Sequence, residues 1–456
     1  MSRSWRIAVV LVLLLSPQRL WAHAHLKRSD PASGSRVSAV SVIKLWFTEM
    51  PELAMTSVRL TNADGGRLLL GAPVTGVTDP LEIDVPLTVI LPPGIYTLSW
   101  STAASDGHPS RGTFKFVVIA PAMKADASLA PADNAVQPSP AKIPSADTAA
   151  AEAMSDASPA GHSLLRAAEF IALLSLVGAL AFPLIILPRV ANLDSALREE
   201  MEKRVALLGI AATAILILTA LAHLAAASAM ANAMTGTHSM TSTEMAMHTR
   251  WGNALRLQII AAFVGLIGFA AAVRRIRPGW LIAGIAALII SVTPALSGHA
   301  GAAARLQGVM IANDFLHVVA GGIWLGTLLC ILIVGIPVAF KRLGTERWLP
   351  VSALVNVFSP IALTAAGVVI VSGLFASWIH LEHLPALWQT RYGQMLLRKL
   401  FFVVIVIIVG AYNYKRIQPV LTHEHGVRRL RRSAILELVA AAGVLIFTGF
   451  LTGIEP

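Results

Sequence analysis

Eight long apolar segments occupy the chain from residue 162 to its end, and they constrain its fold more than any other feature. Each has about the 20 residues that a helix needs to cross a hydrocarbon layer. They lie at residues 164–187, 205–228, 252–273, 279–298, 307–338, 353–378, 395–414 and 433–452. Apolar residues make up 55% of the chain and charged residues only 13%, which excludes an ordinary soluble protein. The sequence therefore predicts an all-α polytopic membrane domain of about eight transmembrane helices over residues 162–456.

Basic residues alternate between the connections that join these segments. The first, third, fifth and seventh connections hold most of them: Arg189, Arg198, Lys203, Arg204, Arg274, Arg275, Arg277, Lys341, Arg342, Arg347, Lys415, Arg416, Arg428, Arg429, Arg431 and Arg432. Because cytoplasmic connections are enriched in lysine and arginine, we expect both chain termini in the periplasm of a bacterium and the helices in its inner membrane. The net charge of +11 follows from this topology, so we expect the lipid bilayer, and no nucleic acid, as a partner.

The first 22 residues have the parts of a secretory signal peptide. Two arginines precede an apolar run at residues 7–15, and the small residue Ala22 stands at the expected cleavage position. Cleavage after Ala22 makes His23 the first residue, and cleavage after Ala24 makes His25 the first; an uncleaved leader gives neither of them a free amine. We expect cleavage after Ala22 and export of the segment that follows.

Residues 23–119 contain short β-branched and aromatic runs separated by turn residues: VIKLWFTEM, SVRLTNADGGRLLL, PPGIYTLSWSTAAS and GTFKFVVIA. This pattern is typical of an all-β sandwich or barrel. Residues 120–161 are rich in Ala, Pro, Ser and Asp and almost lack large apolar residues, so they cannot bury a core. We therefore expect an exported β domain, followed by a disordered linker and then the membrane domain.

The exported domain has a group of residues suited to copper. An N-terminal histidine offers its α-amino nitrogen and its imidazole as one chelating pair, which suits a tetragonal Cu(II) site. His23 has this position after cleavage. Asp106 and His108, in SDGHP, are two residues apart, so on an extended backbone both side chains point to the same side. We expect these residues to contribute to one copper site.

The second connection of the membrane domain combines methionines with histidines in MANAMTGTHSMTSTEMAMH. Thioethers select Cu(I), and imidazole accepts copper in either oxidation state as well as zinc. The pattern predicts a flexible collector of Cu(I) at the outer mouth of the membrane domain. It would comprise Met234, His238, Met240, Met245, Met247 and His248. The alternative is a low-complexity loop in an alanine-rich chain that has 13 methionines.

The strongest signal within the membrane is the pair Asp314 and His317 in NDFLHVVAGGIWLG. These residues are three apart and share a helix face. An ionisable group near the bilayer centre costs about 2.5 to 3.5 kcal/mol on insertion scales, so it indicates a function. Together with His223 and His299, which also fall on the outer side, they are expected to form the copper pathway. The alternative is a buried Asp–His pair that fixes helix packing.

Other ionisable residues in the helices have simpler interpretations. Arg166 and Glu169 are three residues apart and can pair with each other. Lys399 and Glu437 lie close enough to the ends of their segments to extend to the aqueous interface.

These residues carry a resemblance to two families. The exported domain resembles the CopC family of periplasmic copper-binding proteins in its start HAHLKRSDPASGS, in the FTE that ends at Glu49 and in GIYTLSWSTAASDGHPSRGTFKFVV. The membrane domain resembles the CopD family in DFLHVVAGGIWLG, FSPIAL, RYGQMLLRKL and LRRSAILELV. The resemblance covers nearly the whole chain apart from the linker and the second connection.

The resemblance implies a cupredoxin-like, or Ig-like, sandwich that holds one Cu(II). Its ligands would be the amine and imidazole of His23, the imidazole of His108 and the carboxylate of Asp106, with Glu49 beside the metal. Family members that bind Cu(I) in this domain have a Met-rich segment, whereas here only Met50 and Met55 are present. We therefore expect any Cu(I) chemistry in the membrane domain.

The expected function is copper binding in the periplasm and copper import or delivery across the inner membrane, in copper homeostasis or resistance. Other periplasmic copper carriers are expected partners, and no enzymatic activity is expected. The chain has no P-loop, and its single cysteine, Cys330, leaves His, Met and carboxylates as ligands.

Two alternatives remain. A copper brace at the N-terminal histidine could serve an oxidase, although a carboxylate from Asp106 at the metal would block the open position. A haem- or copper-dependent membrane redox protein would need deep histidines on facing helices, for which only His223 and His317 are candidates.

Overall fold

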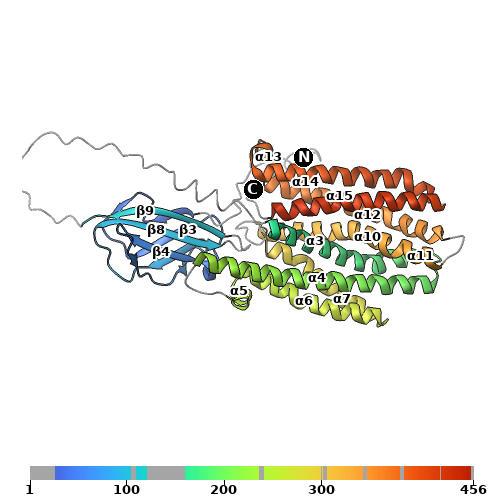
Figure 1. The fold of residues 1–456 in the computed structure, drawn as a ribbon, viewed down its shortest axis with the longest axis horizontal. Coiled ribbons are helices and arrows are strands. Elements are labelled where there is room, and N and C mark those ends of the chain that lie inside the picture. The colour runs from blue at the N-terminus through green and yellow to red at the C-terminus, as the bar shows by residue number, and fades with distance from the viewer. Residues whose placement is uncertain are drawn as a thin grey trace, which may run out of the picture. The chain divides into compact units, whose positions relative to one another are not determined.

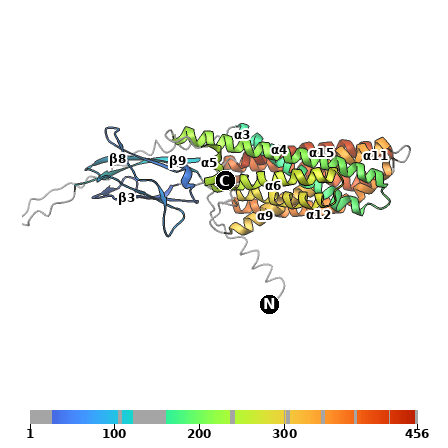
Figure 2. The same cartoon turned by 90° about the horizontal axis from the view of Figure 1, so that it is seen from below.

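The computed structural model describes most of the chain as two compact units, one of strands and one of helices (Figures 1 and 2). The described residues are 26–103, 109–120, 160–235, 241–298, 300, 306–342, 347–380, 385–421 and 423–452. The predicted domain limits at residues 22, 119 and 161 stay predictions, since most of the residues around the first and third limits fall outside these ranges.

The first unit is a sandwich of two sheets. Its strands are β1 (Leu26–Asp30), β2 (Arg36–Val37), β3 (Val42–Phe47), β4 (Ser57–Asn62), β5 (Arg67–Leu68), β6 (Val74–Thr75), β7 (Glu82–Pro86), β8 (Gly94–Ala103) and β9 (Pro109–Val118), with a 3-10 turn η1 (Leu53–Met55). One sheet has the order β1-β3-β7-β6 and the other β2-β9-β8-β4-β5. All neighbours are antiparallel except β2 and β9.

Alternation along the strands builds the core of the sandwich. Successive side chains of a strand point to opposite faces of its sheet, and every second residue of β3 and of β8 from Tyr96 to Trp100 is buried. The rings of Phe47 and Trp100, from different sheets, have centroids 5.2 Å apart and meet edge to face. This aromatic contact joins the two sheets, so the predicted all-β sandwich is confirmed.

The second unit contains eight helical segments that are long and apolar enough to span a membrane, counted over the described residues. In chain order they are α3 (Ala160–Ala181) with η2 (Phe182–Ile186) and η3 (Leu187–Arg189); α4 (Ser195–Thr235); α6 (Arg250–Val273); α7 (Pro278–Leu296); α9 (Gln307–Gly321) with η4 (Gly322–Gly326), α10 (Thr327–Cys330), η5 (Ile331–Gly335) and α11 (Ile336–Arg342); α12 (Trp348–His380); α14 (Arg391–Tyr412) with η6 (Asn413–Ile417) and η7 (Gln418–Val420); and α15 (Glu424–Leu451). Two short helices, α5 (Ser242–His248) and α13 (Ala386–Gln389), lie between spans. The eight predicted spans are confirmed.

Short connections make successive spans run in opposite directions. We call the end of the bundle at which α3 begins the linker end, and the end at which η3 finishes the basic end. In Figures 1 and 2 the long helices run side by side between these two ends.

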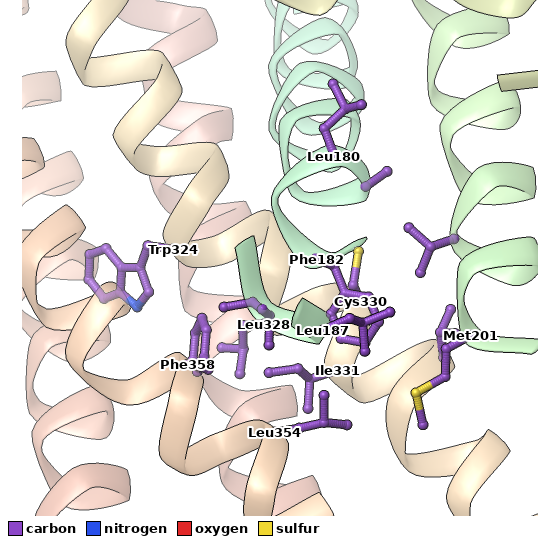
Figure 3. Packing of buried hydrophobic residues seen from close by; sticks show 14 of the residues in the cluster. Leu180, Phe182, Leu187, Met201, Trp324, Leu328, Cys330, Ile331, Leu354 and Phe358 are labelled. Carbon is purple, nitrogen blue, oxygen red and sulfur yellow. The ribbon is translucent and has the colours of Figure 1, made fainter. Parts of the chain in front are cut away.

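The centre of the bundle is apolar and tightly packed. Figure 3 shows Phe182 and Leu187 beside Cys330 and Ile331, where the first and fifth spans meet. Cys330 is fully buried in this cluster. The backbones of the same two spans touch, because a Cβ on Gly178 would collide with the backbone of Gly326. Small residues allow helices in a membrane to approach this closely.

Candidate metal sites

One end of the β-sandwich gathers the described neighbours of the predicted Cu(II) ligands. Leu26, the first described residue, pairs with Phe47, two residues before Glu49. Ala103 pairs with Pro109 on either side of residues 104–108. The backbone N–H of Glu52 donates to the carbonyl of Ala103 at 2.8 Å, which ties these pieces together.

Two carboxylates are buried at this end. Glu49 is 5% exposed and Glu52 is 6% exposed. The Thr56 hydroxyl donates to the Glu52 carbonyl at 2.9 Å and lies 2.7 Å from the Thr102 hydroxyl, which holds the segment against β8. Oxygen donors beside imidazole nitrogens suit Cu(II), so Glu49 fits the predicted site chemically. Glu52 was not predicted from the sequence, where it carries no motif.

The remaining predicted ligands of the β domain, His23, Asp106 and His108, lie outside the described residues. Their role as a copper site stays a prediction.

A buried polar cluster lies among the first four spans at the linker end; we call it the Glu169 cluster. The amide nitrogen Nε2 of Gln258 donates to Oε1 of Glu169 at 3.1 Å, and the Thr293 hydroxyl donates to Oε1 of Gln258 at 2.9 Å. A guanidinium nitrogen of Arg166 lies 3.6 Å from Oε2 of Glu169, so the predicted Arg166–Glu169 pair is confirmed. All four residues are at most 6% exposed.

His223 belongs to the same cluster. Its Nε2 lies 3.3 Å from Oε2 of Glu169, and its ring centroid is 5.0 Å from that of His162, nearly perpendicular to it. Nδ1 of His223 is buried and has no hydrogen-bond partner within the described part of the protein. The cluster therefore contains one buried histidine ring, His223, and a second ring, His162, near the start of α3 at the linker end. His299 lies outside the described residues.

Asp314 and His317 lie in a second group, the Asp314 cluster, among the fifth, sixth and seventh spans. Nδ1 of His317 is 2.8 Å from the Ser372 hydroxyl, and Nδ2 of Asn313 donates to the Ser372 carbonyl at 3.3 Å. A Cβ on Gly373 would lie 3.3 Å from the His317 ring, so the glycine allows the ring to sit against α12. Asp314 interacts electrostatically with Lys399 of α14. The sequence predicted the first two residues but not their partners on other helices.

The second connection is more ordered than expected. Residues 242–248 form α5, because the Thr241 hydroxyl accepts the N–H of Glu244 and the Glu244 carboxylate accepts the N–H of Thr241, a capping box. Met245 is fully buried, while Met247 and His248 are exposed. The expectation of a flexible loop is wrong for this part. His238 and Met240 lie outside the described residues, as does the side chain of Met234.

Lys399 and Glu437, whose side chains were expected to reach the aqueous interface, differ in burial. Lys399 is half-buried and interacts electrostatically with Asp314. Glu437 is only 3% exposed and points into the bundle, so the expectation that its side chain reaches water is wrong. Both of its carboxylate oxygens accept hydrogen bonds from other spans, which holds it inside.

No group of three or more His, Cys, Asp or Glu side chains is arranged to hold a metal ion within the ranges that the structure describes.

Comparisons with known proteins agree with this arrangement. Family models match the chain as CopC domain over residues 26–119, as Copper resistance protein D-like, N-terminal domain over 154–309, and as Copper resistance protein D over 352–451. The chain is 26% identical over 471 residues to Copper transport protein CutJ of Bacillus subtilis, covering 99% of this chain and 77% of that protein. The chain is a CopC–CopD fusion. It is thus a multi-pass membrane protein of a copper resistance and transport family.

The CopC domain has relatives that consist of little else. It is 30% identical over 118 residues to Protein YobA of Escherichia coli, covering 26% of this chain and 94% of that protein. The crystal structure of PcoC, a methionine rich copper resistance protein from Escherichia coli, is 28% identical and covers 21% of this chain and 99% of that one, with a TM-score of 0.20.

In the membrane domain, the two family matches cover different polar clusters. The D-like N-terminal match includes every residue of the Glu169 cluster, and the D match includes Ser372, Lys399 and Glu437. Asp314 and His317 fall between the two matches.

Proposed function

We propose that the protein binds Cu(II) through its CopC domain in the periplasm and carries copper inward through its CopD domain across the inner membrane. Copper is the cargo of this pathway rather than a catalytic cofactor. The Cu(II) ligands in this proposal are His23, Asp106 and His108, with Glu49 beside the metal. The buried carboxylate of Glu49, close in space to the described neighbours of the other three, supports this assignment.

The observation that carries the transport proposal is the Asp314 cluster. It places a carboxylate and an imidazole on one helix face in an apolar span, three residues apart, against a hydroxyl from another span. Ionisable residues are costly in a membrane and mark ion pathways. Imidazole and carboxylate are ligands that copper accepts. His223, in the Glu169 cluster at the same end of the bundle, supplies a second imidazole for the entering ion.

The alternative of a haem redox protein receives less support. Haem ligation by two histidines requires both rings to face one another across a shared cavity. His223 contacts Glu169 and lies near His162, whereas His317 contacts Ser372, so these two deep histidines belong to different clusters.

Cellular copper accumulation tests the proposal. Cells that express the chain should accumulate more copper than cells without it, and a variant with Asp314→Asn and His317→Ala should return accumulation to the level of cells without it. His425→Ala, which removes an exposed histidine at the basic end, is the control and should behave as wild type. The double variant should still insert in the membrane and its CopC domain should still bind Cu(II).

Full accumulation by a well-expressed double variant would exclude the Asp314 cluster from the pathway. Lower accumulation in cells with the wild-type chain would reverse the proposed direction.

A further inference from the structure

Glu437 is a buried carboxyl group that the copper pathway does not use. It lies in α15, five residues beyond Arg432, where the apolar part of the last span begins, and is therefore in the half of the bundle near the basic end. Its partners come from two other spans. The indole Nε1 of Trp324 donates to Oε1 at 3.2 Å, and Nδ2 of Asn413 donates to Oε2 at 2.7 Å.

Both of these donors are neutral groups. A charge buried in an apolar medium is strongly unfavourable unless a cation or a proton accompanies it. On the packed elements, the basic residues nearest in sequence are exposed and point away from the bundle interior: Arg431, Arg432, Lys415 and Arg416. On α3, Arg166 and Glu169 pair with each other at the linker end, and α12 has no ionisable residue between Trp348 and Ile379.

The hydrogen bonds around Glu437 suit a group that gains and loses a proton. In the ionised state, Trp324 and Asn413 each donate to one carboxylate oxygen. The other end of the Asn413 amide, Oδ1, is buried and has no hydrogen-bond partner within the described part of the protein. If the amide rotates by half a turn, Oδ1 accepts a hydrogen bond from a protonated Oε2, while Trp324 continues to donate to Oε1. The carboxyl group of Glu437 is therefore hydrogen-bonded by the same two residues, Trp324 and Asn413, in both of its protonation states.

Both partners also lie in irregular parts of their helices. Trp324 belongs to the π-helical turn η4, and Asn413 begins the π-helical turn η6. Such turns recur at functional sites, and η2 and η5, in the packed centre of the bundle, are π-helical as well.

The Glu437 site continues the polar face of the fifth span. Trp324 follows His317 by seven residues, which places it on nearly the same helix face and about 10 Å further along the axis. Asn413 follows Lys399 by 14 residues, close to four full turns on the seventh span. The same two spans thus carry polar residues at two levels, first around Asp314 and then around Glu437.

We propose that Glu437 binds and releases a proton in each transport cycle, so that copper movement through the CopD domain is coupled to proton movement. The proton passes from water to a carboxylate oxygen of Glu437 and returns to water, and no electron is transferred. This inference rests on the proposed transport function, for which it supplies a driving ion.

Two measurements on the full chain test it. In lipid vesicles, copper uptake by the wild type should change the internal pH, reported by a trapped dye, and an imposed pH gradient should change the uptake rate. Glu437→Gln keeps a group of the same shape that hydrogen-bonds to both partners but cannot ionise, so both effects should disappear. Glu424→Gln makes the same change at the start of the same helix, where Glu424 pairs with Arg347 and Arg428, and should retain both effects.

Infrared difference spectra between acidic and basic pH provide the readout that does not need transport. The wild type should show the carbonyl band of a protonated carboxyl group that is lost in Glu437→Gln. If Glu437→Gln does not insert, Asn413→Leu serves instead: it removes a donor to the ionised carboxylate, so the band should persist to higher pH.

The outcomes separate the two proposals. Copper uptake by the wild type without any pH change, or coupling retained in Glu437→Gln, would overturn the role of Glu437 and leave copper transport intact. A wild type that moves no copper would overturn the transport function; the infrared band would then decide whether Glu437 binds a proton.

Discussion

Glu169 links polar side chains that come from the first four spans. Its two carboxylate oxygens face Arg166 from its own helix, His223 from α4 and Gln258 from α6. Through Gln258 it is also linked to Thr293 of α7. A carboxylate shared by several buried partners is stabilising mainly because each partner would be left unpaired without it.

This gives a prediction for two substitutions of Glu169. Glu169→Ala leaves the Arg166 cation and the Gln258 amide without their acceptor and should cost about 3 to 5 kcal/mol, the usual effect of breaking a buried pair. Glu169→Gln keeps the size and one acceptor and should cost distinctly less. Thermal unfolding in detergent measures both, and equal losses would show that the retained size and acceptor of glutamine contribute nothing and that the negative charge alone holds the cluster together.

The predicted Cu(II) ligands make a second prediction at the same scale. One residue added ahead of His23 moves the α-amine out of the chelate ring, so Cu(II) should bind more weakly and its electron paramagnetic resonance spectrum should lose nitrogen coupling. His108→Ala should have a comparable effect. Arg111→Ala, an exposed change on β9, is the control. Unchanged spectra for both site variants would place the metal elsewhere.

At the scale of the element, α5 separates residues that the sequence could not distinguish. Met245 and Met247 are two residues apart in the same methionine-rich run. On a helix this spacing puts them on different faces, and Met245 is buried while Met247 is exposed beside a guanidinium nitrogen of Arg256, 2.9 Å from its sulfur. Only the exposed side chain is open to a copper ion from solution.

The two faces of α5 should therefore respond differently to substitution. Met247→Ser with His248→Ser should slow copper accumulation at low external copper, with little effect at high copper, because the change removes collection and leaves the pathway. Met245→Ser should instead lower thermal stability, by about 2 kcal/mol or more for a buried methionine, at every copper concentration. Copper uptake measured across a concentration series distinguishes the two. Identical uptake curves for Met247→Ser with His248→Ser and for the wild type would favour a low-complexity segment.

Elements were more predictable than the contacts between them. The eight spans follow from the length of apolar runs, and the strands of the sandwich follow from alternation, since both periods are local properties of the sequence. The partners of His317 and Glu437 are not local: Ser372 is 55 residues from His317, and Trp324 is 113 residues from Glu437. Only helix packing brings such residues together, so no local pattern predicts that Glu437 lies inside the bundle.

At the scale of the whole molecule, the chain combines two units with separate cores. The sandwich core contains Phe47, Trp100 and Phe116, while the helical core is centred on residues such as Phe182 and Cys330. A cooperative transition requires a shared core, so two cores predict two unfolding steps. A ligand of one unit should then stabilise only that unit.

Calorimetry of the full chain tests this separation together with the copper site. Without copper, two transitions are expected. Cu(II) at about 100 times its dissociation constant should stabilise the β-sandwich by about 2.7 kcal/mol, because it binds only the folded form, and should raise the temperature of that transition alone. His108→Ala should abolish the shift without changing the helical transition. If Cu(II) raised both transitions equally in the wild type, the two units would be energetically coupled; if it raised neither, the CopC domain would not hold copper at the predicted ligands.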